Sequence, residues 1–591
     1  MKMPTITVQQ KTLEMLLELQ GLTHNIEEIQ DKLPLLGTDI DSCDADQLVI
    51  EIFPDRPDLL SAETLSHSMR SYLHDDYTKP NLNINTGDVV FHVDSELSNI
   101  RPIILGAVVK GVHTGSNDEE IDIFIKGLME HQEKLHFALG GGRKKVSIGV
   151  HDLETISPPF RVKACEPDTR FIPLAMDEEM SLSEILEKHP KGMEYADLLE
   201  GMDKFPVIFD SDDKVLSFPP IINGSHTTVS NTTKNFLIDV TGWDRRACET
   251  ALSLICLQLT ARNGVIESVT VNNCKGEAEI QPSGKSNIVE VPMRLLPEII
   301  GINLSEEEIR VSLQRMGMSL IEITQIGDDY PDSPEKMSMP EKGGKIAIVE
   351  VPNWRFDILH PIDIIEDIII GHGYENLPSS KPTSSMTGVP RVDHNMRRRL
   401  RESLQGLGFT QIQSLTLSND ADQFENMRWT ANHEVTRITN PITIDHTLLR
   451  HHLLPGILRL LSKNKHNELP HSVYELGTVV RDHKNKNRVA FITAEKSGGF
   501  AAVRGRIQAM MQDLGASFDA DSKMFAEISA IEDGEGPWLA GRSAKIEING
   551  VHVGCFGEID PTISEIFELS VPLNGAEFDV DLLLEVLGDP V

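Results

Sequence analysis

Hydrophobic positions along the chain follow a helical period in some stretches and a strand period in others. Apolar residues three and four positions apart predict amphipathic helices over residues 11–20, 306–316, 361–371 and 396–407. Short apolar runs bounded by turn residues predict strands over residues 5–10, 471–480 and 541–559, the last with a hairpin turn at Asn549-Gly550. Helices and antiparallel strands mixed in this way predict an α+β chain.

One long segment, residues 215–244, carries little charge and many Ser, Thr and Asn residues. Pro219-Pro220 and Asn223-Gly224 are turn signals, so short strands and turns are expected there. Asp239 and Thr241 lie two positions apart in an apolar stretch, and on a strand they would point to the same side. Asp239 could instead cap a turn or a helix, which is a common role for Asp.

The chain has 591 residues, which is too long for one hydrophobic core and suggests about four domains. The patterns divide into units over residues 1–88, 89–276, 277–380 and 391–591, with a linker by composition over residues 377–390. We expect an α/β module first, a helix-rich module third, and an antiparallel sheet with a long helix last.

Composition narrows the class of protein further. No apolar run approaches the roughly 18 residues that a membrane span needs, and the first residues lack the apolar stretch of a signal peptide. The six cysteines form no C-x-x-C pair, which argues against a zinc site or a disulfide framework. We therefore expect a protein of a reducing cytoplasm that does not enter membranes.

Four carboxylates gather in the sequence around the start of the predicted helix at Pro361. Asp363, Glu366 and Asp367 share one helical face, and Asp357 ends the extended segment just before it. Carboxylates this close repel each other unless they are protonated or joined by a cation. Oxygen ligands without Cys or His favour a hard ion, Mg²⁺ before Ca²⁺. The alternative is an ordinary acidic helix start that complements the helix dipole.

The run around this helix closely resembles one family, the archaeal and eukaryotic beta subunit of phenylalanine–tRNA ligase. The matching residues are Pro352, Arg355-Phe356-Asp357-Ile358-Leu359, Asp363, Glu366-Asp367, Gly373-Tyr374 and Asn376. Three further family strings stand at residues 54–61 (Pro-Asp-Arg-Pro-Asp-Leu-x-Ser), 238–242 (Ile-Asp-Val-Thr-Gly) and 304–309 (Leu-Ser-x-x-Glu-Ile). The resemblance therefore spans essentially the whole chain.

This resemblance implies a metal, a partner and a reaction. The four carboxylates, Asp357, Asp363, Glu366 and Asp367, would hold a magnesium ion near the contact with an alpha subunit. The complex, in the family two alpha and two beta chains, would attach phenylalanine to its tRNA with ATP bound by the alpha subunit.

The resemblance also implies that residues 89–276 edit, by hydrolysing tRNA mischarged with tyrosine. A pocket that accepts Tyr and rejects Phe must hydrogen-bond the phenolic hydroxyl, because apolar contact alone cannot separate the two. Small polar side chains suit that task, and the expected pocket residues are Ser217, Asn223, Asp239 and Thr241.

The last unit resembles a class II aminoacyl-tRNA synthetase core. Such cores bind ATP through arginines of their second and third motifs, which neutralise phosphate charge. If Glu475 belongs to the Arg-x-Glu of the second motif, Val473 stands in place of the arginine, and no arginine follows Arg542. We expect a core with the class II shape but without the ATP-binding arginines.

Two other functions compete with an editing beta subunit. One is a non-catalytic tRNA-binding or assembly scaffold whose editing pocket has decayed. The other is a self-sufficient magnesium-dependent enzyme acting on phosphates, against which the absence of a P-loop and of the ATP-binding arginines weighs. The net charge of −36 fits either a salty cytoplasm or tRNA contacts supplied by a partner chain.

Overall fold

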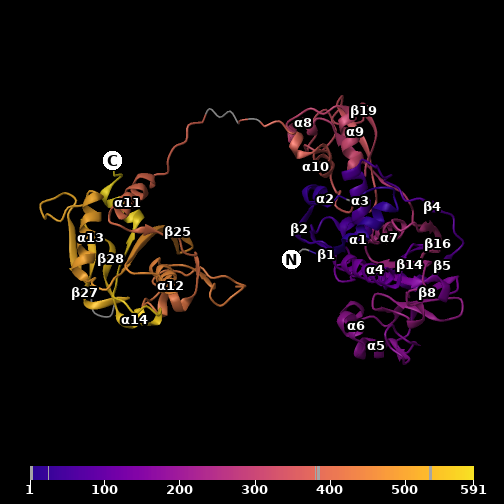
Figure 1. The fold of residues 1–591 in the computed structure, drawn as a ribbon, viewed down its shortest axis with the longest axis horizontal. Coiled ribbons are helices and arrows are strands. Elements are labelled where there is room, and N and C mark those ends of the chain that lie inside the picture. Colours follow the sequence, from indigo (N-terminus) through magenta and orange to yellow (C-terminus); the bar gives the residue numbers. More distant parts are fainter. Residues whose placement is uncertain (1–3, 24, 380, 382–385, 532–535, 591) are drawn as a thin grey trace. The chain divides into compact units, whose positions relative to one another are not determined.

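The computed structural model describes residues 4–23, 25–379, 381, 386–531 and 536–590. The chain forms two compact units, Met1–Lys381 and Pro382–Val591, each of which combines sheets with helices (Figure 1). The α+β class is thereby confirmed, while the finer boundaries at residues 88, 276 and 380 stay predictions. The expected linker over 377–390 contains the division between the units, and its residues 380 and 382–385 lie outside the described part.

The first unit begins with a small sheet of order β1-β3-β2 packed against helices. Its elements are β1 (Thr5–Gln9), β2 (Thr38–Cys43), β3 (Gln47–Ile52), α1 (Gln10–Glu18), α2 (Ile26–Lys32) and α3 (Ala62–His74). Strand β1 buries Ile6 and Val8 and exposes the positions between or beside them, as strand periodicity requires. The predicted strand and helix at the N-terminus are therefore confirmed.

Two larger sheets follow. The five-stranded sheet has the order β4-β15-β6-β14-β7, and the seven-stranded sheet has the order β13-β12-β11-β8-β5-β16-β17. The strands are β4 (Ile84–Asn85), β5 (Val90–Val93), β6 (Ile103–Lys110), β7 (Val146–Asp152), β8 (Phe160–Cys165), β11 (Phe205–Phe209), β12 (Val215–Phe218), β13 (Ile222–Asn223), β14 (Phe236–Gly242), β15 (Val265–Glu267), β16 (Val269–Asn272) and β17 (Ala278–Gln281). The short strands β9 (Arg170–Phe171) and β10 (Met180–Ser181) pair with each other.

Helices cover one face of the five-stranded sheet. They are α4 (Asp118–Ala138) and α7 (Arg245–Thr260), while α5 (Leu182–Lys188) and α6 (Pro190–Tyr195) belong to a smaller satellite core. Strand β14 turns Phe236, Ile238 and Val240 into the same core as these two helices. The alternate residues, which include Asp239 and Thr241, therefore point to the opposite face.

The first unit ends with the sheet β18-β20-β19 and three helices. Their bounds are β18 (Asn287–Pro292), β19 (Ser319–Gln325), β20 (Lys345–Val351), α8 (Leu295–Ile300), α9 (Glu306–Arg315) and α10 (Pro361–His372). Ser305 and Glu308 form the predicted capping box of α9, and Pro361 begins α10 as predicted.

The second unit is built on a seven-stranded sheet of order β21-β24-β25-β29-β28-β27-β26, in which only β21 pairs in parallel among the described strands. The strands are β21 (Thr410–Gln411), β24 (His471–Arg481), β25 (Lys484–Ala494), β26 (Ala526–Ala530), β27 (Trp538–Ile548), β28 (Val551–Ile559) and β29 (Leu573–Asp579). A small separate pair is formed by β22 (Leu417–Ser418) and β23 (Leu448–Leu449). The predicted hairpin at Asn549-Gly550 joins β27 to β28.

Helices pack on both faces of this sheet. Alternate residues of β25 enter two separate cores, Val489 and Phe491 into one, Ala490 and Ile492 into the other. The first core contains α11 (His394–Gly406), α13 (Phe500–Asp513) and α15 (Val580–Leu587); the second contains α12 (Leu454–Lys463) and α14 (Pro561–Ile566). The sheet is thus covered on both sides by helices of its own unit.

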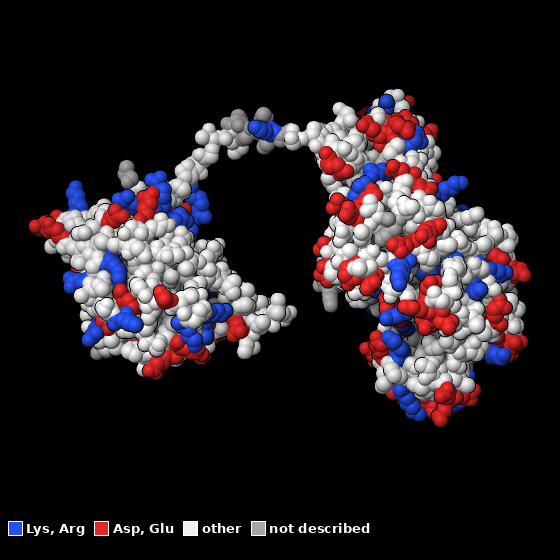
Figure 2. Space-filling view, viewed as in Figure 1, with Lys and Arg blue, Asp and Glu red and all other residues white. Residues whose placement is uncertain are grey.

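Charge and membrane features agree with the composition. Acidic side chains are spread over both units on the face shown in Figure 2, in keeping with the net charge of −36. None of the described helices is both long enough and apolar enough to cross a membrane.

Candidate functional site

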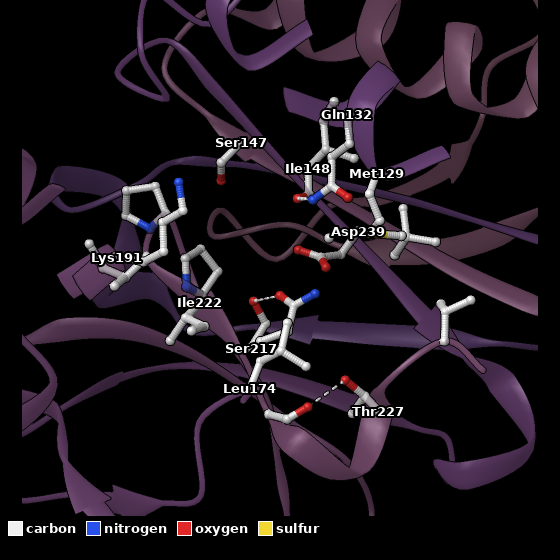
Figure 3. A pocket seen from close by; sticks show the side chains of 18 of the residues that line it. Met129, Gln132, Ser147, Ile148, Leu174, Lys191, Ser217, Ile222, Thr227 and Asp239 are labelled. Atoms are coloured by element: carbon white, nitrogen blue, oxygen red, sulfur yellow. Dashed lines mark hydrogen bonds between the residues drawn. The ribbon is translucent and has the colours of Figure 1, made fainter. Parts of the chain in front are cut away.

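A cavity of about 350 Å³ lies along the edge strand β7 of the five-stranded sheet. Helix α4, strand β7, strand β14 and the segment from Ser217 to Val229 supply its walls (Figure 3). The walls are largely apolar, with Ile125, Met129, Ile148, Val150, Leu174, Ile221, Ile222 and Val229. A few polar side chains interrupt them, which is the usual composition of a small-molecule site.

Asp239 is placed in this cavity by the pairing of three strands. It lies in β14 opposite Gly149 of β7 on one side and Gly106 of β6 on the other. A methyl group on Gly149 would lie 1.9 Å from Asp239 Oδ2, so glycine is required for this carboxylate to occupy its position. Asp239 is 2% exposed and lines the cavity. It lies inside a strand, so it does not cap a turn or a helix.

The carboxylate of Asp239 is bonded to a histidine that the sequence had not singled out. His151 Nε2 lies 2.8 Å from Asp239 Oδ2, and His151 Nδ1 lies 2.9 Å from Thr227 Oγ1. Thr227 in turn donates to the Gly224 carbonyl at 3.0 Å. A buried chain of hydrogen bonds through His151 and Thr227 therefore holds Oδ2 of the Asp239 carboxylate.

Ser217 and Asn223, two of the residues expected in the editing pocket, both line this cavity. They face each other on the paired strands β12 and β13, and Ser217 Oγ donates to Asn223 Oδ1 at 3.1 Å. Figure 3 shows Ser217 below Asp239 in that view. Three of the four expected residues are thus brought together.

Thr241 is not among the residues that line the cavity. It points to the same side of β14 as Asp239, as predicted, but its hydroxyl accepts from Arg101 Nε at 2.7 Å and contacts Ser147 Oγ at 3.0 Å. Arg101 is buried, and burial lowers its pKa to about 10. This arginine covers Thr241, so the expectation that Thr241 lines the pocket is corrected to a supporting contact behind Ser147.

A buried arginine forms another part of the wall. Arg143 donates to the carbonyls of Pro220 and Ile221 at 3.1 and 2.9 Å, pairs with Glu133, and lies over the Tyr195 ring at 4.5 Å. Burial raises the pKa of Glu133, but its contacts with His136 and Arg143 outweigh this and hold it at about 2. Arg143 thereby fixes the turn that connects the strands of Ser217 and Asn223.

Sequence reasoning missed His151, Thr227, Arg143 and Glu133. No local spacing connects them with Asp239, because they come from separate elements that only the sheet pairing brings together. One signal was present: Gly149 and His151 alternate in an apolar run, which is typical of a strand with a polar inner face.

The acidic stretch around α10 is arranged differently from the expectation. Arg355 lies between Asp357 and Asp367, with its Nη2 2.6 Å from an oxygen of each. Asp363 turns back to accept from the backbone N–H groups of Leu359 and His360, both at 2.7 Å. Glu366 is exposed.

In this arrangement the four carboxylates do not converge on one point. Burial raises the pKa of Asp367 to about 6, against the opposing effect of Arg355. Among the described residues, no three His, Cys, Asp or Glu side chains form a group that could hold a metal ion. The cation that joins Asp357 and Asp367 is the guanidinium of Arg355, and the residues as arranged do not fit a magnesium ion.

In the second unit, the position of Val473 is on β24, two residues before Glu475. Glu475 is buried and bonded to Arg450 Nη1 and Ser414 Oγ, each at 2.6 Å. On β29, the buried Glu577 accepts from the backbone N–H groups of Leu453 and Leu454 at the start of α12. Both carboxylates are therefore used in packing helix and loop onto the sheet.

Comparisons with known proteins agree with this architecture. Family models match residues 132–263 (B3/4 domain), 289–374 (tRNA synthetase B5 domain) and 377–580 (Phenylalanyl tRNA synthetase beta chain CLM domain). The phenylalanine–tRNA ligase beta subunits of Methanothrix thermoacetophila and Methanococcoides burtonii are 38% and 36% identical, over 98% of this chain and all of theirs. A crystal structure of an N-terminal beta-subunit fragment from Pyrococcus horikoshii superimposes with a TM-score of 0.55 and 31% identity, covering 63% of this chain and all of that one.

The fold and the three domain matches define a component of an aminoacyl-tRNA synthetase. The chain belongs to the family of phenylalanine–tRNA ligase beta subunits. The resemblance seen in the sequence is thus confirmed. All the residues that line the cavity except Ile125 and Met129 lie within the B3/4 region, the editing domain of this family.

Proposed function

We propose that the cavity beside β7 hydrolyses the ester of tyrosine on the tRNA for phenylalanine. The observation that carries this proposal is the convergence of Asp239, Ser217 and Asn223 on one largely apolar cavity of the B3/4 region. The apolar walls accept an aromatic ring, and the polar groups among them supply partners for a phenolic hydroxyl.

The chemistry asked of the site is addition of water to the ester carbonyl and departure of the ribose hydroxyl, which yields free tyrosine and tRNA. The carboxylate of Asp239 accepts the phenolic proton in a hydrogen bond, and the amide of Asn223 donates to the phenol oxygen. A phenylalanine ring in the same place would leave these buried groups without partners, at a cost that supports discrimination of up to 10⁴-fold. Positioning of the ester and of the water supplies much of the remaining rate.

Synthesis of the aminoacyl-tRNA requires a partner. Family membership implies an alpha subunit, tRNA and ATP, and we propose that the alpha subunit binds the ATP in a complex of two alpha and two beta chains. Support comes from Val473 at the expected arginine position, and from the engagement of Glu475 and Glu577 in internal packing. The second unit then serves as a class II-like scaffold in the cytoplasmic enzyme.

A magnesium ion at Asp357, Asp363, Glu366 and Asp367 stays a prediction. Binding there would require Arg355 to leave its two carboxylates and Asp363 to leave the helix start. No step of the editing reaction depends on such an ion.

A scaffold with a decayed pocket remains the competing function, and deacylation separates the two. Preformed Tyr-tRNA for phenylalanine is incubated with the alpha–beta complex carrying wild-type chain, Asp239→Ala or, as a control, Asp152→Ala. Asp152 is a buried carboxylate of the same sheet that does not line the cavity. We expect hydrolysis by wild type and the control and a loss of about 100-fold with Asp239→Ala. No hydrolysis by wild type would favour the scaffold.

A further inference from the structure

We propose that His151 is a positioning residue of the editing site, which holds Asp239 as an oriented hydrogen-bond acceptor. This inference rests on the proposed editing function. It begins with the contacts of His151, whose side chain is wholly buried between Thr227 and Asp239.

The ring of His151 is held at both nitrogens. Nδ1 lies 2.9 Å from Thr227 Oγ1, which also lies 3.0 Å from the Gly224 carbonyl oxygen. Nε2 lies 2.8 Å from Asp239 Oδ2, and because a carboxylate oxygen accepts, Nε2–H is the donor of this hydrogen bond. The two contacts together direct Nε2 of the imidazole at the carboxylate.

The geometry leaves Asp239 one orientation. Gly149 lies directly opposite on β7, and its Cα is so close that a Cβ would stand 1.9 Å from Oδ2 and 2.8 Å from His151 Nε2. Among the described residues, His151 provides the only side-chain hydrogen bond to this carboxylate. With Oδ2 held by His151, the second oxygen is available to the cavity that Asp239 lines.

Other charged groups lie near this pair, because Glu133, Arg143 and Lys191 line the same cavity. Arg101 from the segment before β6 is near enough to attract Asp239, and His226, from the turn beside Thr227, is near enough to repel a charged His151. Burial lowers the pKa of His226, which is therefore neutral at pH 7. Arg101 bonds Thr241, and among the described side chains it is His151 that hydrogen-bonds the carboxylate.

A graded set of variants tests the orienting contact. His151→Gln keeps a donor near Asp239, His151→Ala removes it, and Gly149→Ala keeps both residues while displacing the carboxylate. The matched control is His131→Gln, a buried histidine of α4 that bonds Gln258 away from the cavity. Each is made in the full chain in complex with the alpha subunit, and deacylation of Tyr-tRNA and Phe-tRNA is measured from pH 5.5 to 8.5.

We expect kcat/KM for Tyr-tRNA at pH 7 to fall about tenfold with His151→Gln and about 100-fold with His151→Ala and Gly149→Ala. A buried carboxylate that loses the His151 contact binds a proton more readily, so the acidic limb of the His151 variant profiles should lie at higher pH than in wild type. The small rate with Phe-tRNA should change less, which lowers the selectivity for tyrosine. His131→Gln should leave all three quantities unchanged.

Unchanged rate, profile and selectivity in both His151 variants, with loss of activity in Asp239→Ala, would overturn the positioning role and leave the editing site intact. Equal hydrolysis by Asp239→Ala and wild type would instead refute the editing site itself. If His151→Ala reduces folded yield, the His151→Gln profile and the Gly149→Ala rate still decide the question.

Discussion

Replacing Glu577 by Gln tests the view that the second unit is a packed scaffold. Glu577 accepts from Leu453 and Leu454 N–H at 3.1 and 3.2 Å, from His452 Nδ1 at 3.2 Å and from Arg488 Nη1 at 3.3 Å. A glutamine amide has one acceptor oxygen instead of two, and its NH2 group would face N–H donors with which it cannot form hydrogen bonds. The start of α12 would then lose a charged partner.

The magnitude follows from the pKa of Glu577. Burial raises this pKa, but His452, Arg488 and Arg481 outweigh it and hold it at about 2, against an ordinary value of 4.5. A difference of about 2.5 units corresponds to about 3 kcal/mol. Part of this free energy comes from attraction to His452 in its protonated form. Burial lowers the pKa of His452 to about 4, so at pH 7 the ring is neutral and this part is absent. We therefore expect the unfolding free energy to fall by about 2 kcal/mol at pH 7.

The sign of the pH dependence is fixed by the lowered pKa. The carboxylate stabilises the folded state fully above pH 4.5, and this contribution is lost as pH falls toward 2. The difference between wild type and Glu577→Gln should therefore shrink over that range.

Hydrogen exchange gives a local readout suited to a chain of several domains. Amides of residues 450–464 should exchange about 30-fold faster in Glu577→Gln at pH 7, while those of the first unit stay unchanged. The control is Glu568→Gln, which removes an exposed pair with Lys465 in the same unit. Equal protection in wild type and Glu577→Gln would refute the reasoning.

Three further outcomes are expected. The isolated chain should show no phenylalanine-dependent pyrophosphate exchange, and adding the alpha subunit should restore it. Exchange by the isolated chain would show that its class II-like core binds ATP. Asp363→Ala should destabilise α10 by about 1 kcal/mol through loss of its cap, seen as faster amide exchange, whereas Glu366→Ala should not. If the variant that carries both Asp363→Ala and Glu366→Ala weakens magnesium binding and the contact with the alpha subunit, the metal prediction holds. If its magnesium dependence is unchanged, these residues act only at the start of the helix. Thr241→Ala should slow Tyr-tRNA deacylation by tenfold or less, since Thr241 lies behind the cavity wall; a loss as large as that of Asp239→Ala would contradict this placement.

Local features of the fold could be predicted wherever a periodic pattern met a clear cap. The helix at Pro361, the capping box at Ser305 and the hairpin at Asn549 all depend on residues within a few positions of each other. The strand that carries Asp239 and Thr241 followed in the same way. Such features need no knowledge of tertiary structure.

Contacts between distant residues could not be predicted. His151 reaches Asp239 across 88 positions because β7 and β14 pair in one register, and Arg101 covers Thr241 across 140 positions. Arg355 is only two residues from Asp357, yet its role between two carboxylates depends on a turn that brings α10 beside it. Spacing showed which side chains share a face, and burial and pairing decided what each one contacts.

The central claim is that this chain removes tyrosine from the tRNA for phenylalanine at Asp239. The most direct measurement is the accumulation of Tyr-tRNA when the alpha–beta complex is supplied with tyrosine, ATP and this tRNA. With the wild-type chain we expect almost no Tyr-tRNA, although ATP is consumed. With Asp239→Ala, Tyr-tRNA should accumulate while Phe-tRNA synthesis stays nearly intact. Equal accumulation by the two complexes would contradict the claim.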